Sequence, residues 1–272
     1  MNDFLSDIVS TLSDRLSAPL MDRSIARLSN KLSLPSHLIA LLLLVEDKRF
    51  MVHPGVDVIA ISRALLKNLK RRKISQGAST ITQQVYNIRY AATRTNGGRL
   101  FKKAVQATWA MCYTLTHSKM SVISEYLSGV YWGRSYHGIE RASWGYFGVQ
   151  PSELTVAQGF FLCERLASPN SVSPRRVSAL IHRCSISRYF LAQPDSLQEL
   201  CNIYEHFFGC REVLSALLKQ HEATGIRVDL VSENQRSLDE LAVNREDTRG
   251  RRLPMKKVGC YSGLRFSGNV RR

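Results

Sequence analysis

The chain has 272 residues, enough to bury a full-sized core as one large domain or as one domain with an appendage. Charged residues make up only 22%, which excludes a disordered polyelectrolyte. The net charge of +16 predicts an acidic partner: nucleic acid, anionic lipid or a phosphorylated substrate. The longest apolar run, Leu38 to Val45, is far shorter than the roughly 20 residues of a membrane-spanning helix, so no transmembrane segment is predicted.

Residues 1–33 are predicted to form an N-terminal amphipathic helical segment. Its apolar residues recur at three- and four-residue spacing: Leu5, Ile8, Val9, Leu12, Leu16 and Leu20. The pattern fits a helix on a membrane surface or one packed on the core, and the mixed charges of its polar face favour packing. The segment has neither the basic start nor the continuous apolar core of a secretory signal, so no export address is visible.

The next predicted helix begins at Pro35, includes residues 37–45 and ends at Glu46, which is followed by Asp47. Burial of the apolar run would hold a carboxylate at its end in a partly desolvated place. Desolvation favours the protonated form and moves a carboxylate towards acid–base behaviour. This stretch is therefore a candidate active site.

After a turn at Pro54-Gly55, residues 59–69 are predicted to form a helix with a basic end over 67–73, which is either a solvated helix end or a region that steers anions. Small, hydroxyl and amide side chains then gather within eight residues: Gly77, Ser79, Thr80, Thr82, Gln83 and Gln84. Such a group can hydrogen-bond many hydroxyls or phosphate oxygens at once, which suits a sugar.

Residues 89–103 are polar and basic and contain two glycines, which predicts a mobile basic flap. Helices are predicted over 104–115, 120–127, 142–147, 175–192 and 197–220. Because no sustained period-two alternation occurs, the fold is predicted to be mainly α.

Residues 223–272 are predicted to form a basic, disordered tail. After Asp247 they contain eight Lys or Arg and no acid, which also predicts binding to anionic lipid. The six cysteines of the chain include no Cys-x-x-Cys pair and no zinc-like spacing, so no metal ligands are assigned.

Four stretches resemble motifs of the family 51 glycosyltransferases, the peptidoglycan polymerases found alone or fused to penicillin-binding transpeptidases. Residues 46–55 resemble Glu-Asp-x-x-Phe-x-x-His-x-Gly, and residues 77–84 resemble Gly-x-Ser-Thr-x-Thr-Gln-Gln. Residues 118–133 and 138–148 are similar to the fourth and fifth motifs. The resemblance runs from about Leu34 to Pro174 and predicts a catalytic domain over 34–222.

The resemblance implies a lysozyme-like, two-lobed helical domain with one lobe dipping into the bilayer. The implied reaction joins the 4-hydroxyl of an acceptor sugar to C1 of a polyprenyl-diphosphate donor, with inversion, and so polymerises lipid II-type disaccharides into β-1,4 glycan strands. The implied partners are lipid II, the growing glycan strand, an anionic membrane surface and a membrane partner. The implied location is the periplasm or the outer face of the cytoplasmic membrane. No nucleic acid is expected, because no base-reading motif is present.

Glu46 matches the general base of the family. By position in the motifs, twelve residues are implied to bind substrate: Asp47, Phe50, His53, Gly77, Ser79, Thr80, Thr82, Gln83, Gln84, Lys102, Lys103 and Lys119. The residues themselves leave open whether His53 contacts substrate or only satisfies a turn.

The departures from the family pattern concern the donor side. The third motif, Arg-Lys-x-x-Glu, corresponds to residues 102–106, so Gln106 stands where the second catalytic carboxylate is usual. Asn87, Gly98 and Ser128 replace a lysine, an arginine and an asparagine. Mg²⁺ or another divalent cation bridging the donor diphosphate is implied only as an option, with no protein ligand assigned.

Two readings of activity follow from these departures. Arg89, Arg94 and Arg99 are candidates to supply the missing charge, and Glu125 is a weak candidate to replace the carboxylate. If they do so, the protein is an active glycosyltransferase. The alternative is a degenerate relative that binds glycan or lipid-linked precursor without turnover.

Overall fold

The computed structural model describes residues 21–71, 79–90, 98–193 and 195–223. The chain divides after Ile226 into two units, and all described residues lie in the first. They form helices and one isolated antiparallel bridge, Tyr131 with His137, and no strand is found among them. The mainly α prediction is therefore confirmed. The predicted helix over 5–20 and the basic tail from 224 onward lie outside the described residues.

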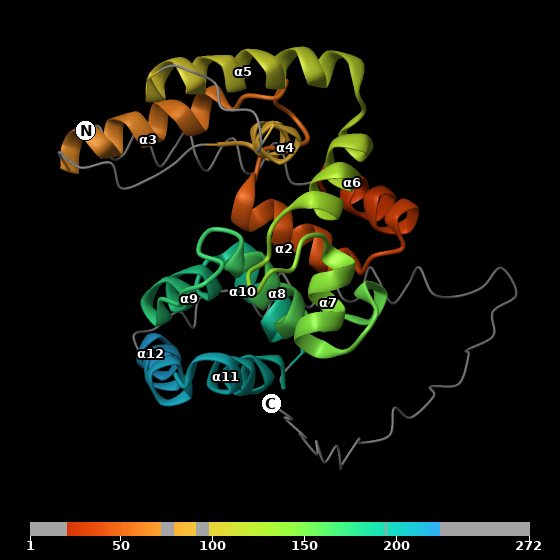
Figure 1. Cartoon of the computed structure of the whole chain (residues 1–272). Coiled ribbons are helices and arrows are strands. Elements are labelled where there is room, and N and C mark those ends of the chain that lie inside the picture. Colours follow the sequence, from red (N-terminus) through yellow and green to blue (C-terminus); the bar gives the residue numbers. More distant parts are fainter. Residues whose placement is uncertain (1–20, 72–78, 91–97, 194, 224–272) are drawn as a thin grey trace, which may run out of the picture. The chain divides into compact units, whose positions relative to one another are not determined.

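A helical stretch over 21–32 is followed by the labelled helices of Figure 1. In chain order these are α2 (Ser36–Glu46), α3 (Val58–Arg71), α4 (Ile81–Arg89), α5 (Arg99–Thr116), α6 (Lys119–Gly129), α7 (Ile139–Phe147), the 3-10 turn η1 (Pro151–Glu153), α8 (Val156–Arg165), α9 (Pro174–Ile181), α10 (Cys184–Leu191), α11 (Ser196–Phe208) and α12 (Arg211–Ala223). Among the described residues, no helix is both long and apolar enough to cross a membrane.

Helix α2 lies at the centre of the core. All seven residues over 38–44 are buried, which follows from a sequence that is apolar on every side of the helix. Its main neighbour is α8, which is buried over most of its length, and α10 also packs on it. Because α2 is enclosed over residues 38–44, the residues that follow at its C-terminal end have a fixed position.

The helices pack in two groups around this centre (Figure 1). In one group, α4 packs on both α5 and α6. In the other, α8 packs on α2 and α11, while α12 packs on α9 and α11. Helix α6 also contacts α7, which packs on η1.

The predicted flap over 89–103 is wrong at both ends. Arg89 ends α4, and α5 begins at Arg99, one residue after the N-cap Gly98. The run of charge misled the prediction, because basic residues are good helix formers when, as with Lys102 and Lys103, they lie on an exposed side. Residues 91–97 lie outside the described residues.

The two predicted C-terminal helices are in fact four. A turn at residues 182–183 separates α9 from α10, with no glycine or proline to mark it. Gly209 ends α11 with a φ of +62°, a left-handed cap that glycine adopts readily. The sequence therefore carried a signal for the second break but none for the first.

Gly55 of the His-Pro-Gly turn provides a test of this packing. Its φ is +90°, and an added Cβ would lie 2.2 Å from the carbonyl oxygen of Ala110 on α5. We expect Gly55→Ala to lower the free energy of unfolding by about 3 kcal/mol or more, from backbone strain plus overpacking. Urea denaturation measures this loss.

Gly148→Ala is the matched control. Gly148 also has a positive φ, +68°, but open space surrounds the position of its Cβ. We expect a loss of only about 1–2 kcal/mol, from strain alone. Equal losses in the two variants would contradict the close approach of the turn to α5.

Candidate active site

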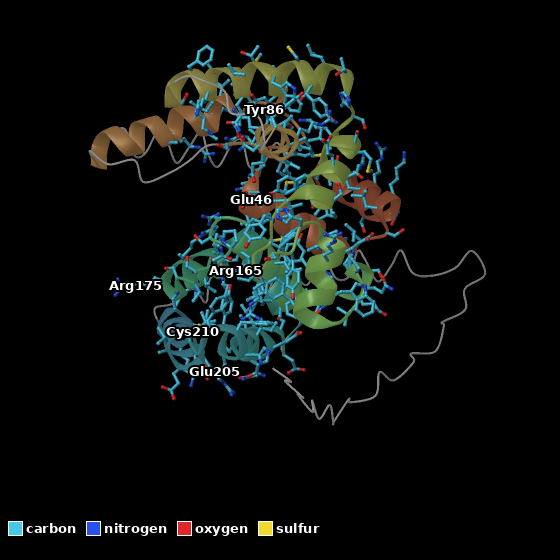
Figure 2. All side chains as sticks on the ribbon, viewed as in Figure 1. Glu46, Tyr86, Arg165, Arg175, Glu205 and Cys210 are labelled. Atoms are coloured by element: carbon cyan, nitrogen blue, oxygen red, sulfur yellow. The ribbon has the colours of Figure 1, made fainter. Side chains whose placement is uncertain are left out.

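Glu46, the last residue of α2, accepts a hydrogen bond from Gln84 Nε2 of α4 at 2.8 Å. Tyr126 of α6 donates its hydroxyl to Gln84 Oε1 at 3.0 Å, which fixes the orientation of the amide. Burial raises the pKa of the Glu46 carboxyl, while the Gln84 hydrogen bond and the charge of Arg176 oppose the rise. In the view of Figure 2, Glu46 lies between Tyr86 of α4 and the lower helices.

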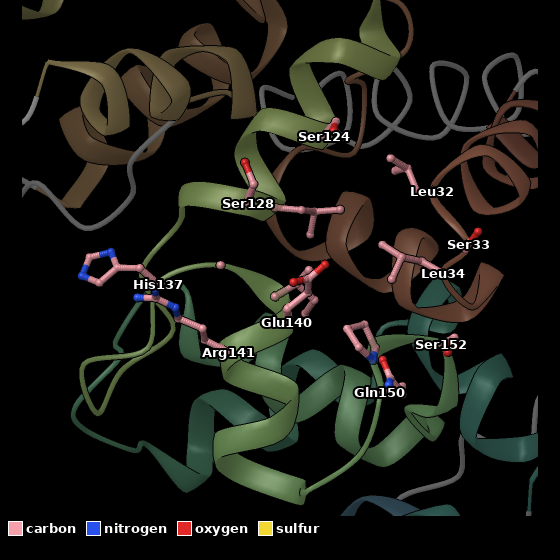
Figure 3. A pocket seen from close by; sticks show the side chains of 14 residues that line it. Leu32, Ser33, Leu34, Ser124, Ser128, His137, Glu140, Arg141, Gln150 and Ser152 are labelled. Carbon is pink, nitrogen blue, oxygen red and sulfur yellow. The ribbon is translucent and has the colours of Figure 1, made fainter.

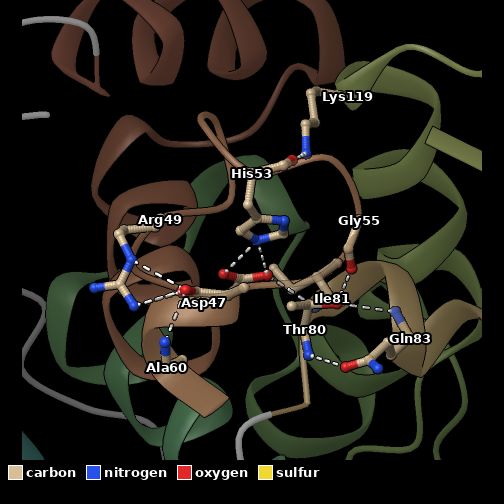
Figure 4. A network of polar contacts seen from close by, with 10 residues as sticks. Asp47, Arg49, His53, Gly55, Ala60, Thr80, Ile81, Gln83 and Lys119 are labelled. Atoms are coloured by element: carbon tan, nitrogen blue, oxygen red, sulfur yellow. Dashed lines mark hydrogen bonds and ion pairs between the residues drawn. The ribbon is translucent and has the colours of Figure 1, made fainter. Parts of the chain in front are cut away.

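Asp47 fastens the loop after α2 to the start of α4 (Figure 4). His53 Nε2 lies 2.9 Å from Asp47 Oδ1, and the Ile81 amide donates to Asp47 Oδ2 at 3.0 Å. The hydroxyl of Thr80 donates to the Gly55 carbonyl at 2.6 Å. Asp47 and His53 are both buried. Through the hydrogen bonds of Asp47, residues 46–55 are joined to residues 77–84 in the protein interior.

A second buried carboxylate stiffens the same loop (Figure 4). Arg49 Nη2 lies 2.6 Å from Asp57 Oδ2, and the Ala60 amide donates to Asp57 Oδ1 at 2.8 Å. Burial would raise the pKa of Asp57, but the hydrogen bonds from Arg49 and Ala60 outweigh it and lower the pKa.

Three polar residues of the second motif face the protein interior. Thr80 and Gln83 form a capping box at the start of α4, each side chain bonding the other residue's amide. Thr82 is fully buried. These residues fix the start of α4, the helix on which Gln84 lies. Gly77 lies outside the described residues.

Lys119, the first residue of α6, lies against the loop after α2 and contacts Phe50 of that loop. The Lys119 ammonium donates to the His53 carbonyl at 2.6 Å (Figure 4). It also lies 4.5 Å from the centre of the buried Phe50 ring. Burial lowers the pKa of Lys119 to about 8. Lys119 therefore supports the loop that carries His53.

Ser79, Lys103 and Gln106 meet between α4 and α5. Lys103 Nζ donates to Ser79 Oγ and to Gln106 Oε1, each at 2.8 Å. Gln106 Nε2 donates to the Gln83 carbonyl at 2.7 Å and to Asn87 Oδ1 at 2.9 Å. Lys102 is exposed. The arrangement places a lysine ammonium among neutral partners.

The site thus combines a partly buried carboxylate of raised pKa, held by the Gln84 amide, with Lys103 at Ser79 and Lys119 at the His53 carbonyl. The family model described as Transglycosylase matches residues 18–189, well over half of the chain. The chain belongs to the transglycosylase family. The match extends beyond the predicted range of 34–174 at both ends, and with the helices it confirms the lysozyme-like fold class.

Named relatives agree with this assignment. The chain is 33% identical to the biosynthetic peptidoglycan transglycosylase of Nitrosomonas eutropha, over 53% of this chain and 57% of that protein. It is 37% identical to penicillin-binding protein 1B of Vibrio cholerae, over 52% of this chain and 18% of that protein. It is 32% identical to penicillin-binding protein 1A of Streptococcus oralis, over 52% and 22%. The match therefore spans from under a quarter to just over half of these relatives.

The donor side of this transglycosylase does not fit the implied divalent cation. The carboxylate expected at position 106 is an amide, and both its donors and its acceptor are engaged by protein groups. A hard cation such as Mg²⁺ prefers carboxylate and water oxygens. Within the described ranges, no group of three or more acidic, His or Cys side chains is arranged to hold a metal.

Arg89 does not supply the missing charge in this arrangement. Its guanidinium forms a two-point pair with Glu125 of α6 and donates to Tyr113 of α5 at 2.8 Å. Glu125 is therefore committed to Arg89 and to the Tyr113 hydroxyl, which donates to it at 2.5 Å. Arg94 and the side chain of Arg99 lie outside the described residues.

Arg176 of α9 is a neighbour of Glu46 that the sequence did not reveal. Its charge lowers the pKa of Glu46, and its Nε lies 3.9 Å from Oε1 of the buried Glu164. The adjacent Arg175-Arg176 after Pro174 was the available signal, but nothing in the sequence places α9 beside the end of α2.

A hollow of about 710 Å³ lies apart from these residues, between α6, α7 and the end of the helix over 21–32 (Figure 3). Ser124, Ser128, Glu140 and Arg141 contribute to its lining, and none of the predicted site residues does. This hollow is therefore not the centre of the candidate chemistry.

The loop–helix clamp gives a direct prediction. We expect Asp47→Asn to lower the free energy of unfolding by about 2–3 kcal/mol, because an amide nitrogen cannot accept the hydrogen bonds that a carboxylate oxygen accepts here. Urea denaturation followed by tryptophan fluorescence measures the loss.

Asp195→Asn is the control, because Asp195 is exposed and makes no side-chain cap at the start of α11. We expect a change within about 0.5 kcal/mol. If Asp47→Asn were equally harmless, Asp47 would not be holding the loop to α4.

Proposed function

We propose that this transglycosylase polymerises lipid II-type polyprenyl-diphosphate disaccharides into β-1,4 glycan strands, with Glu46 as the general base. The observation that carries the proposal is the partly buried Glu46 carboxylate, held by Gln84, whose pKa is raised by desolvation. A base with a raised pKa is better matched to taking a proton from a sugar hydroxyl near neutral pH. The names of the relatives point to the same chemistry.

The mechanism has two requirements. Glu46 takes the proton of the acceptor 4-hydroxyl as the oxygen attacks C1 of the donor, and the bond from C1 to the diphosphate breaks on the opposite face. Positive charge must then stabilise the departing diphosphate. Lys103, which donates to Ser79, meets that requirement best among the described residues, since Arg89 is paired with Glu125.

The alternative is a family member that binds glycan or lipid-linked precursor without turnover. The neutral Gln106, with its amide fully engaged, favours it. Substrate binding without any polymer from purified full-length protein would support the alternative, and clear turnover would exclude it.

The test of the base is Glu46→Gln. We expect at least about a 100-fold loss of lipid II polymerisation, the usual effect of removing a general base. We also expect the free energy of unfolding at pH 7 to rise, because a buried charge is removed and Gln84 can still donate to the new amide oxygen.

The sign of the pH effect follows from the raised pKa of Glu46. The native state resists ionisation of this carboxyl, so its ionisation costs stability once the pH exceeds its pKa in the unfolded chain. The stability advantage of Glu46→Gln should therefore disappear as the pH falls below about 4. The variant thus loses activity without losing its fold.

Glu199→Gln is the matched control. Glu199 of α11 also has a pKa raised by burial, and it accepts a hydrogen bond from Thr155 at 2.8 Å. Its polymerisation should match that of the wild type. Polymer made equally well by Glu46→Gln would show that Glu46 is not the base.

We propose that α3 and α5 carry the surface that meets an anionic membrane. Large apolar side chains are exposed there: Val58, Ile59 and Ile61 on α3, and Phe101, Met111 and Leu115 on α5. Exposed apolar residues near basic ones are typical of interfacial binding. The basic run over 67–73 continues from α3, and its side chains lie outside the described residues.

Vesicle co-sedimentation tests this surface. Val58→Asp and Leu115→Asp should each weaken binding to phosphatidylglycerol vesicles by about tenfold, from the lost burial of an apolar side chain. High salt screens the contribution of the basic tail. Leu191→Asp on α10, whose side chain is 54% exposed, should have no effect. Equal behaviour of the three variants would contradict the assignment to α3 and α5.

A further inference from the structure

Both N–H donors and the carbonyl oxygen of the Gln106 amide are hydrogen-bonded inside the protein. Gln106 is only 4% exposed, and it is both a donor to Gln83 and Asn87 and an acceptor from Lys103. A side-chain amide has two N–H donors and one carbonyl oxygen, so both donors and the oxygen are in use. A carboxylate at this position would lack both donors and would face the Gln83 carbonyl.

Asn87 and Gln106 are two of the departures from the family pattern, and they touch. The family pattern has a lysine at the first position and a glutamate at the second. The structure places the two substituted side chains 2.9 Å apart, from Gln106 Nε2 to Asn87 Oδ1. A cation and an anion have thus been replaced by two neutral amides, and the summed formal charge of the two positions is unchanged.

Because Gln106 and Asn87 are neutral, they leave the charge of Lys103 available to bind an anionic ligand. Its ammonium is fixed by two neutral acceptors, Ser79 and Gln106, and no described carboxylate lies within ion-pair distance of it. An ammonium has three N–H donors, so one remains for a ligand. Lys103 as a whole is exposed, but partial desolvation of its ammonium lowers its pKa.

We infer that Lys103 binds the diphosphate of the donor and that Gln106 and Asn87 are positioning residues that hold it there, so that donor binding needs no divalent metal ion. A glutamate at 106 would pair with Lys103 and compete with the diphosphate for its charge. The neutral amide orients the ammonium without neutralising it. The inference rests on the proposed function, because it assumes a polyprenyl-diphosphate donor.

Calorimetric binding of farnesyl diphosphate, a short-chain prenyl diphosphate, to the full-length protein tests the inference. In EDTA, we expect binding by the wild type, a loss of affinity of about tenfold or more in Lys103→Met, and retention of most affinity in Lys103→Arg. Added MgCl₂ should change the wild-type affinity by less than about twofold.

Gln106→Glu is the decisive variant. We expect about a tenfold loss of affinity in EDTA, because the new carboxylate pairs with Lys103. Added MgCl₂, or a second change Asn87→Lys, should restore binding by neutralising that carboxylate. Gln158→Glu is the matched control, because Gln158 sits in the capping box of α8 and makes the same amide-to-acid change away from the site.

Binding that requires MgCl₂ in the wild type, or that survives Lys103→Met undiminished, would overturn the inference. A polymerisation assay on the same samples separates it from the proposed function. Metal-independent diphosphate binding through Lys103 with no polymer would refute the function alone. Polymer formed only with MgCl₂ would refute the inference alone.

Discussion

Burial of α2 imposes the constraint on which the site depends. A helix that is apolar on all sides is enclosed by α8 and its neighbours over residues 38–44, and its last residue, Glu46, lies partly buried at the edge of that enclosure. Ionising Glu46 there is costly, and the single hydrogen bond from Gln84 offsets only part of the cost. The same packing that stabilises the core therefore raises the basicity of the carboxylate.

The rest of the site extends this constraint outward. Asp47 carries the end of α2 to the start of α4, so the residue that contacts Glu46 comes from a helix tied to the same loop. Gln106 and Asn87 position Lys103 between α4 and α5, and no described acid opposes its charge. A basic carboxylate and an uncompensated cation thus both lie next to residues of one short helix, α4.

The sequence predicted the buried helix, the acid at its end and the helical class, because these depend on local pattern and on a well-marked motif. It did not predict that Lys119 would donate a hydrogen bond to the His53 carbonyl, or that Gln106 would donate one to Asn87. Those contacts join segments from different helices, and no periodicity records them. The proximity of Arg176 to Glu46 was not predicted for the same reason, since the helix of Arg176 follows Glu46 by more than a hundred residues.

Direct titration of the Glu46 carboxyl tests the account most closely. Protein labelled with ¹³C at glutamate Cδ gives one resonance that Glu46→Gln removes, and its pH dependence reports the pKa. The account predicts a value above the ordinary glutamate value of about 4.3, and a further rise in Gln84→Leu, which keeps the burial and removes the donor. A value at or below the ordinary one, or no change in Gln84→Leu, would contradict it.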